Sequence, residues 1–196
     1  MRYRIFALLG LFYLSLAGVS FGADQYAVDP AHTAVGFAVQ HLVISTVKGS
    51  FPEVSGDIFY DEADVTKSSV KVTIQASSIN TNNPDRDKHL KSADFLDATQ
   101  YPTLVFQSAK VEKQGDSYLC VGNLTIHGVT KEVSIPFEIA GKVKDPWGKT
   151  SIGIEGSLTI NRHDYGVSWN KTMDNGGVVV GDKVKISLNV EAVLKE

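Results

Sequence analysis

Histidine is the residue type in this 196-residue chain best suited to metal or proton chemistry, and it occurs five times. The five are His32, His41, His89, His127 and His163. No pair shows the H-x-H or H-E-x-x-H spacing that brings three or four zinc ligands together. His32 and His41 flank one expected strand, where the extended chain between them spans about 30 Å. The sequence therefore predicts histidines in separate loops, with no metal centre and no cofactor.

Two charged segments could instead hold an anionic group. The first carries Arg86, Asp87 and His89, and the second carries Arg162 and Asp164 at the end of an expected strand. An arginine can bind a carboxylate or a phosphate through two parallel N–H donors. The alternative is an internal salt-bridge network, of the Arg162–Asp164 or Arg86–Asp87 type, that stabilises one end of the fold. The sequence leaves both interpretations open.

Covalent and nucleotide chemistry have no motif to support them. The chain lacks a G-x-S-x-G elbow, a Walker loop and a G-x-G-x-x-G fingerprint. The single cysteine, Cys120, excludes an internal disulfide and lies between Leu119 and Val121 in a strand pattern. A buried, inert thiol is favoured over a reactive one, because free cysteine usually behaves as a small apolar residue. We therefore do not expect an enzyme.

The elements that must position these residues are strands. Apolar and polar residues alternate over 70–76, 133–139 and 184–192. A period of two with one apolar face is typical of strands that are buried on one side. Weaker strand patterns occupy five further segments: 33–41, 54–60, 104–111, 118–126 and 151–161. These make about eight strands, and the short turns between them favour antiparallel neighbours in an up-and-down order.

One connection, residues 80–102, carries a charged helical segment in place of a short turn. Asn83 can cap a helix, and Pro84 suits its first position. Ser92 can cap a second short helical turn that runs to Ala98. The Tyr101-Pro102 step then favours an extended exit into the next strand. An insertion of this kind usually covers or binds something.

Residues 1–22 have the features of a cleaved secretory signal peptide. Arg2 and Arg4 precede an apolar run over 5–17, and small residues precede the expected cleavage after Gly22. The alternative, an uncleaved membrane anchor, is disfavoured because this run is shorter than the roughly 20 residues of a spanning helix. Residues 23–196 then form a single domain without a transmembrane segment. The formal charge of −3 becomes more negative without the two arginines, which argues against nucleic acid and anionic membrane surfaces as partners.

Five segments, in this order, resemble the YceI-like family of periplasmic polyisoprenoid-binding proteins. They are residues 26–42 (YAVDPAHTAVGFAVQHL), 47–61, 77–108, 122–133 and 159–169 (TINRHDYGVSW). The chain departs from the family pattern at Thr33, at Phe95-Leu96 and at Tyr165. The resemblance implies an all-β fold: an eight-stranded antiparallel lipocalin-like barrel with a short helical insertion. It also implies a long apolar tunnel for isoprenoid lipids such as polyprenyl phosphates and quinones.

Alternation along the strands and this resemblance together select the candidate ligand-binding residues. The expected tunnel residues are Phe37, Val39, Ile74, Phe95, Phe106, Ile126, Phe137, Ile160 and Leu188. The expected residues of the tunnel ends are His41, Arg86, Asp87, His89, Arg162, Asp164 and Trp169. Among these, Arg86, His89, Arg162 and His41 are the available donors for a phosphate or quinone head group.

The predicted function is periplasmic transport, storage or sequestration of a bound isoprenoid lipid. Two alternatives belong to other functional classes. One is an enzyme that acts on a bound prenyl lipid through histidine and arginine groups, and the other is a stress-responsive interaction module whose lipid is only a filler. An exchange of an edge or lid between protomers would give a symmetric homodimer.

Overall fold

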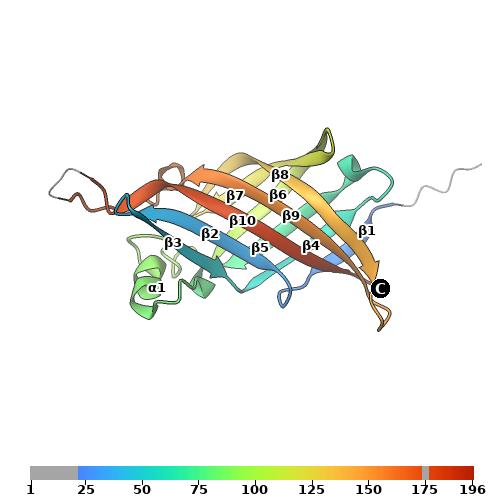
Figure 1. The fold of residues 1–196 in the computed structure, drawn as a ribbon, viewed down its shortest axis with the longest axis horizontal. Helices are drawn as coiled ribbons and strands as arrows, with labels where there is room; N and C mark the ends of the chain where they lie inside the picture. Colours follow the sequence, from blue (N-terminus) through green and yellow to red (C-terminus); the bar gives the residue numbers. More distant parts are fainter. Residues whose placement is uncertain (1–21, 174–176) are drawn as a thin grey trace, which may run out of the picture.

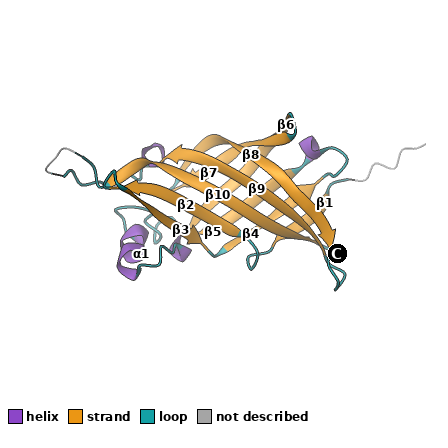
Figure 2. Cartoon of the chain, in the orientation of Figure 1, coloured by secondary structure: helices purple, strands orange, loops and turns teal. Residues whose placement is uncertain are grey.

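The structure is a computed structural model that describes residues 22–173 and 177–196. The expected signal peptide lies outside the described residues except for Gly22. The described chain forms ten strand segments, one α-helix and three short 3-10 helices (Figures 1 and 2). The strands are β1 (Asp24–Val28), β2 (Ala34–His41), β3 (Ser45–Phe51), β4 (Val54–Tyr60), β5 (Ser69–Gln75), β6 (Thr103–Gln114), β7 (Ser117–Ile126), β8 (Val129–Lys144), β9 (Thr150–Asn161) and β10 (Val180–Leu194). The helices are η1 (Val65–Lys67), η2 (Ala76–Ser78), α1 (Pro84–Lys91) and η3 (Arg162–Tyr165).

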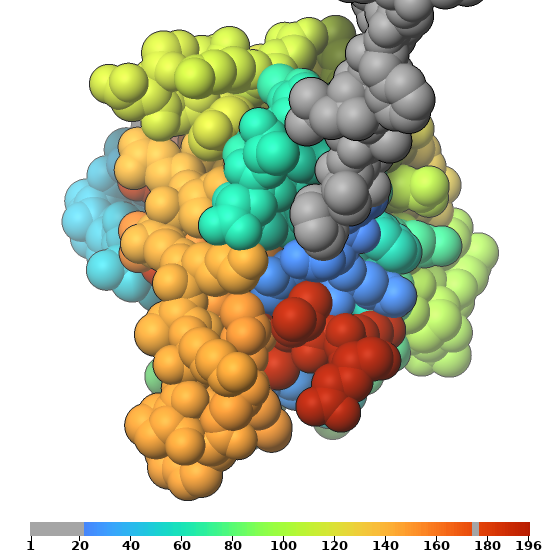
Figure 3. All heavy atoms as spheres, turned by 90° about the vertical axis from the view of Figure 1, so that its right-hand side faces the viewer, coloured from blue at the N-terminus to red at the C-terminus, as the bar shows by residue number. Residues whose placement is uncertain are grey.

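Strand β10 closes the sheet into a barrel, because it pairs with β9 on one side and with both β1 and β2 on the other. Strand β4 continues the ring beside β1, and β3 lies beside β2. The pairs β1/β2 and β3/β4 are therefore two interrupted strands. Counted in this way the barrel has eight antiparallel strands, which confirms the predicted fold class. Figure 3 looks onto the barrel end where the C-terminal residues lie beside β1.

The break between β1 and β2 is held to β10 by side chains and backbone. Asp29 N donates to Glu191 O (2.9 Å), and the Thr33 hydroxyl donates to the same carbonyl (3.2 Å). The Thr33 hydroxyl also accepts from Glu191 N (3.2 Å). Threonine at this position thus supplies the hydroxyl that a serine would supply. The sequence departure at Thr33 leaves this junction intact.

The helical insertion agrees with the prediction at its start and differs at its end. Asn83 caps α1, because its side-chain oxygen accepts from Arg86 N (3.0 Å), and Pro84 is the first helical residue. Beyond Ser92 the chain forms hydrogen-bonded turns instead of the expected second helical segment, although the Ser92 hydroxyl does accept from Asp94 N (3.4 Å). Ser92 is the C-cap of α1, and its hydroxyl donates to His89 O (2.7 Å). The chain then continues as turns, since Phe95 N and Asp97 N both donate to the Ser92 carbonyl.

Two strand segments were not anticipated from the sequence, β1 and β3. Strand β1 is short, and β3 has the sequence STVKGSF with few apolar residues. Both are stabilised by pairing with neighbours far along the chain or across the hairpin rather than by their own pattern. The remaining strands lie where alternation predicts them, and the apolar side chains of the alternating pattern line the barrel interior.

Cys120 lies in β7 with 6% of its surface exposed, and its side chain faces the barrel interior. Burial raises the pKa of this thiol to about 11. Because the thiolate is the reactive species, the native protein holds Cys120 in its unreactive, protonated form at neutral pH. The predicted inert thiol agrees with this environment.

Native protein should therefore react with iodoacetamide far more slowly than unfolded protein. We expect mass spectrometry to show little alkylation of Cys120 near neutral pH, and complete alkylation in denaturant. Labelling of the native protein at the rate of the denatured chain would contradict the buried, protonated thiol.

Candidate functional site

The middle of the barrel contains an apolar cavity of about 190 Å³. Inward-facing side chains from all ten strands form its wall, with β1 and β3 contributing one residue each, Val28 and Phe51. Its few polar side chains are hydroxyls, those of Thr33, Tyr60, Ser68 and Ser69. None of the described residues on this wall carries a charge. Such a space favours a hydrocarbon chain over any ion.

A second apolar cavity, of about 130 Å³, lies at the barrel end that carries α1 and η3. Leu90 of α1 and Phe95 and Leu96 of the following loop form part of its wall. The two cavities share five wall residues: Phe37, Phe51, Leu104, Ile126 and Ile186. They therefore adjoin, and together they extend along the barrel interior.

The boundary between the cavities contains a pair of aromatic rings. Phe37 of β2 packs against Phe51 of β3 with ring centroids 5.7 Å apart. Gly49 allows this arrangement, because a Cβ atom at that position would collide with the Phe37 ring. Phe37 therefore lies against β3 and narrows the interior where the cavities meet.

All the apolar side chains predicted from alternation and resemblance lie on these walls. Ile74, Phe106, Phe137 and Leu188 line the central cavity. Val39, Phe95 and Ile160 line the cavity beside α1, and Phe37 and Ile126 line both. Their contact with a ligand stays a prediction. Alternation could also have identified Ile186, which shares the inward face of Leu188, whereas Phe51 has no local pattern that marks it.

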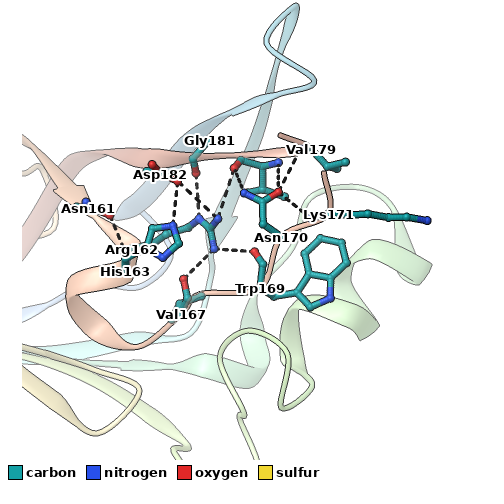
Figure 4. A network of polar contacts seen from close by, with 11 residues as sticks. Asn161, Arg162, His163, Val167, Trp169, Asn170, Lys171, Val179, Gly181 and Asp182 are labelled. Atoms are coloured by element: carbon teal, nitrogen blue, oxygen red, sulfur yellow. Dashed lines mark hydrogen bonds and ion pairs between the residues drawn. The ribbon is translucent and has the colours of Figure 1, made fainter. Parts of the chain in front are cut away.

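Arg162 lies on the wall of the cavity beside α1, and its guanidinium donates hydrogen bonds to backbone carbonyls (Figure 4). Nε donates to Gly181 O (3.0 Å), and Nη1 donates to Val167 O and Trp169 O (2.8 Å each). Nη2 donates to Val180 O at 3.4 Å. The side chain is only 5% exposed. Arg162 thus joins η3, the segment after it and β10, and this use favours the structural interpretation.

The partner expected for Arg162 within its own segment is corrected by the structure. Asp182 of β10, rather than Asp164, is the carboxylate near the guanidinium, 3.9 Å from Nη2. Asp182 also contacts His163 Nε2 at 2.9 Å. Asp164 is the third residue of η3 and is exposed. Sequence proximity is misleading here because β10 passes directly beside η3.

Arg86 and Asp87 meet through a third residue, Thr81. Arg86 Nε donates to the Thr81 hydroxyl (2.7 Å), and Nη2 donates to the Thr81 carbonyl (2.9 Å). One Asp87 oxygen accepts from Thr81 N (2.8 Å) and from the Thr81 hydroxyl (2.5 Å). Thr81 is 5% exposed, so these bonds hold the start of the insertion in place. Arg86 Nη1 is outside this set of bonds.

His89, Phe95 and Trp169 form an aromatic cluster beside the second cavity. Their ring centroids lie 4.9–5.2 Å apart. His89 Nε2 also contacts an Asp94 carboxylate oxygen at 2.8 Å. The cluster joins α1, the loop after it and the segment after η3. His41 stands apart, half-buried at the end of β2 opposite Val180.

Among the described residues, one group could offer three ligands to a metal ion: Asp29, His32 and Glu191. Their candidate ligand atoms lie within 4.8 Å of one another, and His32 Nδ1 is 2.8 Å from Asp29 Oδ2. This hydrogen bond lowers the pKa of Asp29 and raises the pKa of His32. Sequence spacing missed the group because Glu191 comes from β10. The predicted absence of a bound metal stays a prediction.

Over residues 22–173 and 177–196, the structure contains no helix with the length and apolar character needed to cross a membrane.

Known proteins resemble this chain in both sequence and fold. The family model of the YceI-like domain matches residues 26–192. A UPF0312 protein of Pseudomonas aeruginosa (strain LESB58) is 39% identical over 182 residues, which cover 92% of each chain. The chain thus shares both its length and much of its sequence with this relative.

Two solved structures share the fold at lower identity. BcnA of Burkholderia cenocepacia superimposes with a TM-score of 0.74 at 24% identity, over 84% of this chain and 98% of that chain. A domain from Saccharophagus degradans superimposes with a TM-score of 0.63 at 14% identity, over 87% and 98% of the two chains. That domain is described as a polyisoprenoid binding domain implicated in plant cell wall breakdown.

Replacing Arg162 by Met should destabilise the fold, because four backbone carbonyls lose a charged donor. Hydrogen bonds to charged groups contribute about 1.5–3 kcal/mol each, so we expect a loss of at least about 3 kcal/mol in the free energy of unfolding. Denaturant titration measures it, with His163→Ala on the exposed side of the same network as the milder control. Wild-type stability in Arg162→Met would show that the carbonyl network is dispensable.

Proposed function

The chain belongs to the YceI-like family, and on that premise we propose that its barrel binds a long-chain isoprenoid or similar amphiphilic lipid. The bound lipid would be transported, stored or sequestered in the periplasm. Export is part of the proposal and rests on the signal-peptide features of residues 1–22. The role needs no catalysis, since enclosure of the tail is itself the function.

The observation that carries this proposal is the pair of adjoining apolar cavities. An isoprenoid tail in water exposes apolar surface at a cost of about 25 cal/mol per Å². An eight-stranded barrel is wide enough to hold one small ligand instead of being filled by its own side chains. The walls supply hydrocarbon contacts along the barrel, so the tail can replace its contacts with water by contacts with protein. The Saccharophagus degradans domain offers a parallel for the ligand class, but its likeness to this chain extends only to the fold.

The head group is best placed outside the cavities, at the end beside α1. Among the described residues, Arg162 is the one charged residue on a cavity wall, and its donors are already bonded to carbonyls. A phosphate inside the barrel would therefore lie unpaired in an apolar space, which is strongly unfavourable. Arg86 Nη1 and the half-exposed His89 lie on α1 and could meet a polar group there.

The same features support a binding protein over an enzyme. The described walls offer hydroxyls and one thiol, and burial keeps the Cys120 thiol protonated. No acid–base pair of side chains faces either cavity among the described residues. Mass spectrometry of solvent extracts from the purified protein separates the alternatives: a stoichiometric prenyl lipid supports the carrier. Turnover of added prenyl phosphate supports the enzyme, and an empty barrel supports the interaction module.

Replacing Ile74 by Trp should reduce the amount of lipid recovered with the protein, because the larger ring would occupy the central cavity. Overpacking typically costs about 1–3 kcal/mol, so the variant should remain folded. The matched control is Lys71→Trp, which places the same ring on the exposed face of β5. Mass spectrometry measures occupancy, and full occupancy in a folded Ile74→Trp protein would exclude the central cavity as the tail site.

Replacing Arg86 by Ala should weaken binding of a prenyl phosphate by about tenfold, the equivalent of one lost charge-assisted hydrogen bond. Binding of an uncharged prenyl chain of equal length should change little. The control is Arg86→Lys, which keeps the positive charge but loses the guanidinium hydrogen bonds to Thr81. Equal losses for both ligands would assign Arg86 a purely structural role at Thr81.

A further inference from the structure

The β2–β3 hairpin ends in three apolar residues, Leu42, Val43 and Ile44, which we call the β2–β3 tip. Ile44 is 86% exposed and Val43 is 58% exposed. The segment before β10 lies beside the tip, because Leu42 N donates to Val179 O (2.9 Å). The residue before Val179 in this segment, Val178, is 39% exposed. The side chains of Val43, Ile44 and Val178 are exposed to solvent and lie outside the core, whereas Leu42 is half-buried.

The backbone of the tip is unfavourable for the residues that occupy it. Leu42 has φ 52° and Val43 has φ 64°, and Ile44 N closes the turn on His41 O (3.2 Å). Hairpin turns with two central residues in this left-handed region strongly prefer Asn-Gly. A β-branched residue there is a conformational outlier that lowers stability. The hairpin therefore retains apolar side chains at positions where Asn-Gly would fold better.

The hairpin itself carries no carboxylate side chain. The protein has 22 acidic residues, but none lies between Pro30 and Pro52. Lys48 of β3 is the charged residue of the hairpin at neutral pH. The acidity that argues against anionic surfaces for the whole chain is thus absent from the hairpin itself. The exposed carboxylate on the adjoining strand β10, Asp182, contacts His163 and Arg162, so the hairpin can approach a lipid head-group layer without carboxylates of its own.

The tip stands at the same barrel end as the second cavity. Val39 of β2 lines that cavity, and so does Val180, which pairs with His41 at the base of the tip. Figure 1 shows this end of β2 and β3 on the side of the molecule that carries α1. A surface that holds the tip would therefore lie next to the cavity wall formed by α1 and its loop.

We propose that the β2–β3 tip docks the protein on a phospholipid bilayer by inserting Val43 and Ile44 into the interfacial layer. A stable protein partner needs roughly 800 Å² from each side, which a tip of three residues does not offer. Shallow insertion of a few apolar side chains instead gives weak, reversible membrane attachment. Reversibility suits a carrier that must leave the membrane with its lipid. This purpose rests on the proposed function, whereas the docking itself is independent of the cargo.

The opposite barrel end supplies a matched control in the β8–β9 hairpin, where Trp147 is 85% and Val143 is 63% exposed. That turn has favourable local chemistry. One Asp145 oxygen accepts from Trp147 N and Lys149 N, and the left-handed position is occupied by Gly148 (φ 93°). It therefore offers comparable exposed apolar surface without a strained backbone and away from the second cavity.

The experiment is flotation of the purified protein with vesicles of phosphatidylcholine and phosphatidylglycerol. We expect the bound fraction to fall about tenfold or more in Val43→Gly/Ile44→Ser, since two aliphatic side chains no longer leave water. The thermal midpoint should stay level or rise, because glycine accepts φ 64° without strain. In Val143→Ser/Trp147→Ser we expect the bound fraction to stay close to that of the unchanged protein.

Several outcomes would overturn the proposal. They are no flotation of the unchanged protein, unchanged flotation of the β2–β3 variant, or a loss confined to the β8–β9 variant. A dimer in solution that the β2–β3 substitutions dissociate, without vesicle binding, would assign the tip to a second copy of the chain. Lipid extraction from the same samples tests the proposed function separately. If the protein contains no extractable lipid but still floats with the vesicles, the docking proposal is supported and the carrier function is contradicted.

Discussion

Closure of the sheet by β10 is the constraint on which the other features depend. An antiparallel sheet with one apolar face must cover that face, and here it does so by curling until β10 meets β1 and β2. Closure also removes the exposed edges of the sheet, whose unpaired N–H and C=O groups would otherwise invite association. The apolar faces then enclose a common interior. Its cavities follow from eight strands surrounding more space than their side chains fill.

The ends of a closed barrel need a different solution, because the strand ladders stop there. At the end beside α1, Arg162 bonds carbonyls of Val167, Trp169, Val180 and Gly181 that lie near the end of the β9–β10 pairing. Backbone acceptors left unpaired near an apolar cavity would be costly, so a buried guanidinium with several donors satisfies many of them at once. The aromatic cluster of His89, Phe95 and Trp169 packs the insertion onto this end. The most polar residues of the site thus act mainly as supports for the cavity.

This division gives the two parts of the molecule different physical tasks. The central cavity supplies an apolar environment with no charged side chain among its described wall residues, and the α1 end supplies polar groups at the boundary with water. An amphiphilic lipid has the same two parts, so the arrangement matches a tail inside and a head group outside. The β2–β3 tip adds apolar surface at the same end, where it does not stabilise the fold.

Local pattern was sufficient wherever a residue's role depends on its neighbours along the chain. Alternation determined which side chains of β2 and of β5 to β10 face inward, because side chains on a strand point to opposite faces in turn. The Asn83 cap and Pro84 determined the start of α1 for an equally local reason, as orphan N–H groups are satisfied within a few residues. The order of five family segments was sufficient to indicate the fold. By contrast, β1 and β3 carry weak patterns, and they form strands because β10 and β2 offer them ladders.

What only the tertiary structure decided is the set of partners that come from distant segments. Arg162 pairs with β10 and the segment before it instead of with Asp164, since β10 passes beside η3. Asp29, His32 and Glu191 gather because the break between β1 and β2 lies against β10. The physical reason is common to both: long side chains bond whichever donor or acceptor the closed sheet places within reach, and closure is a property of the whole chain.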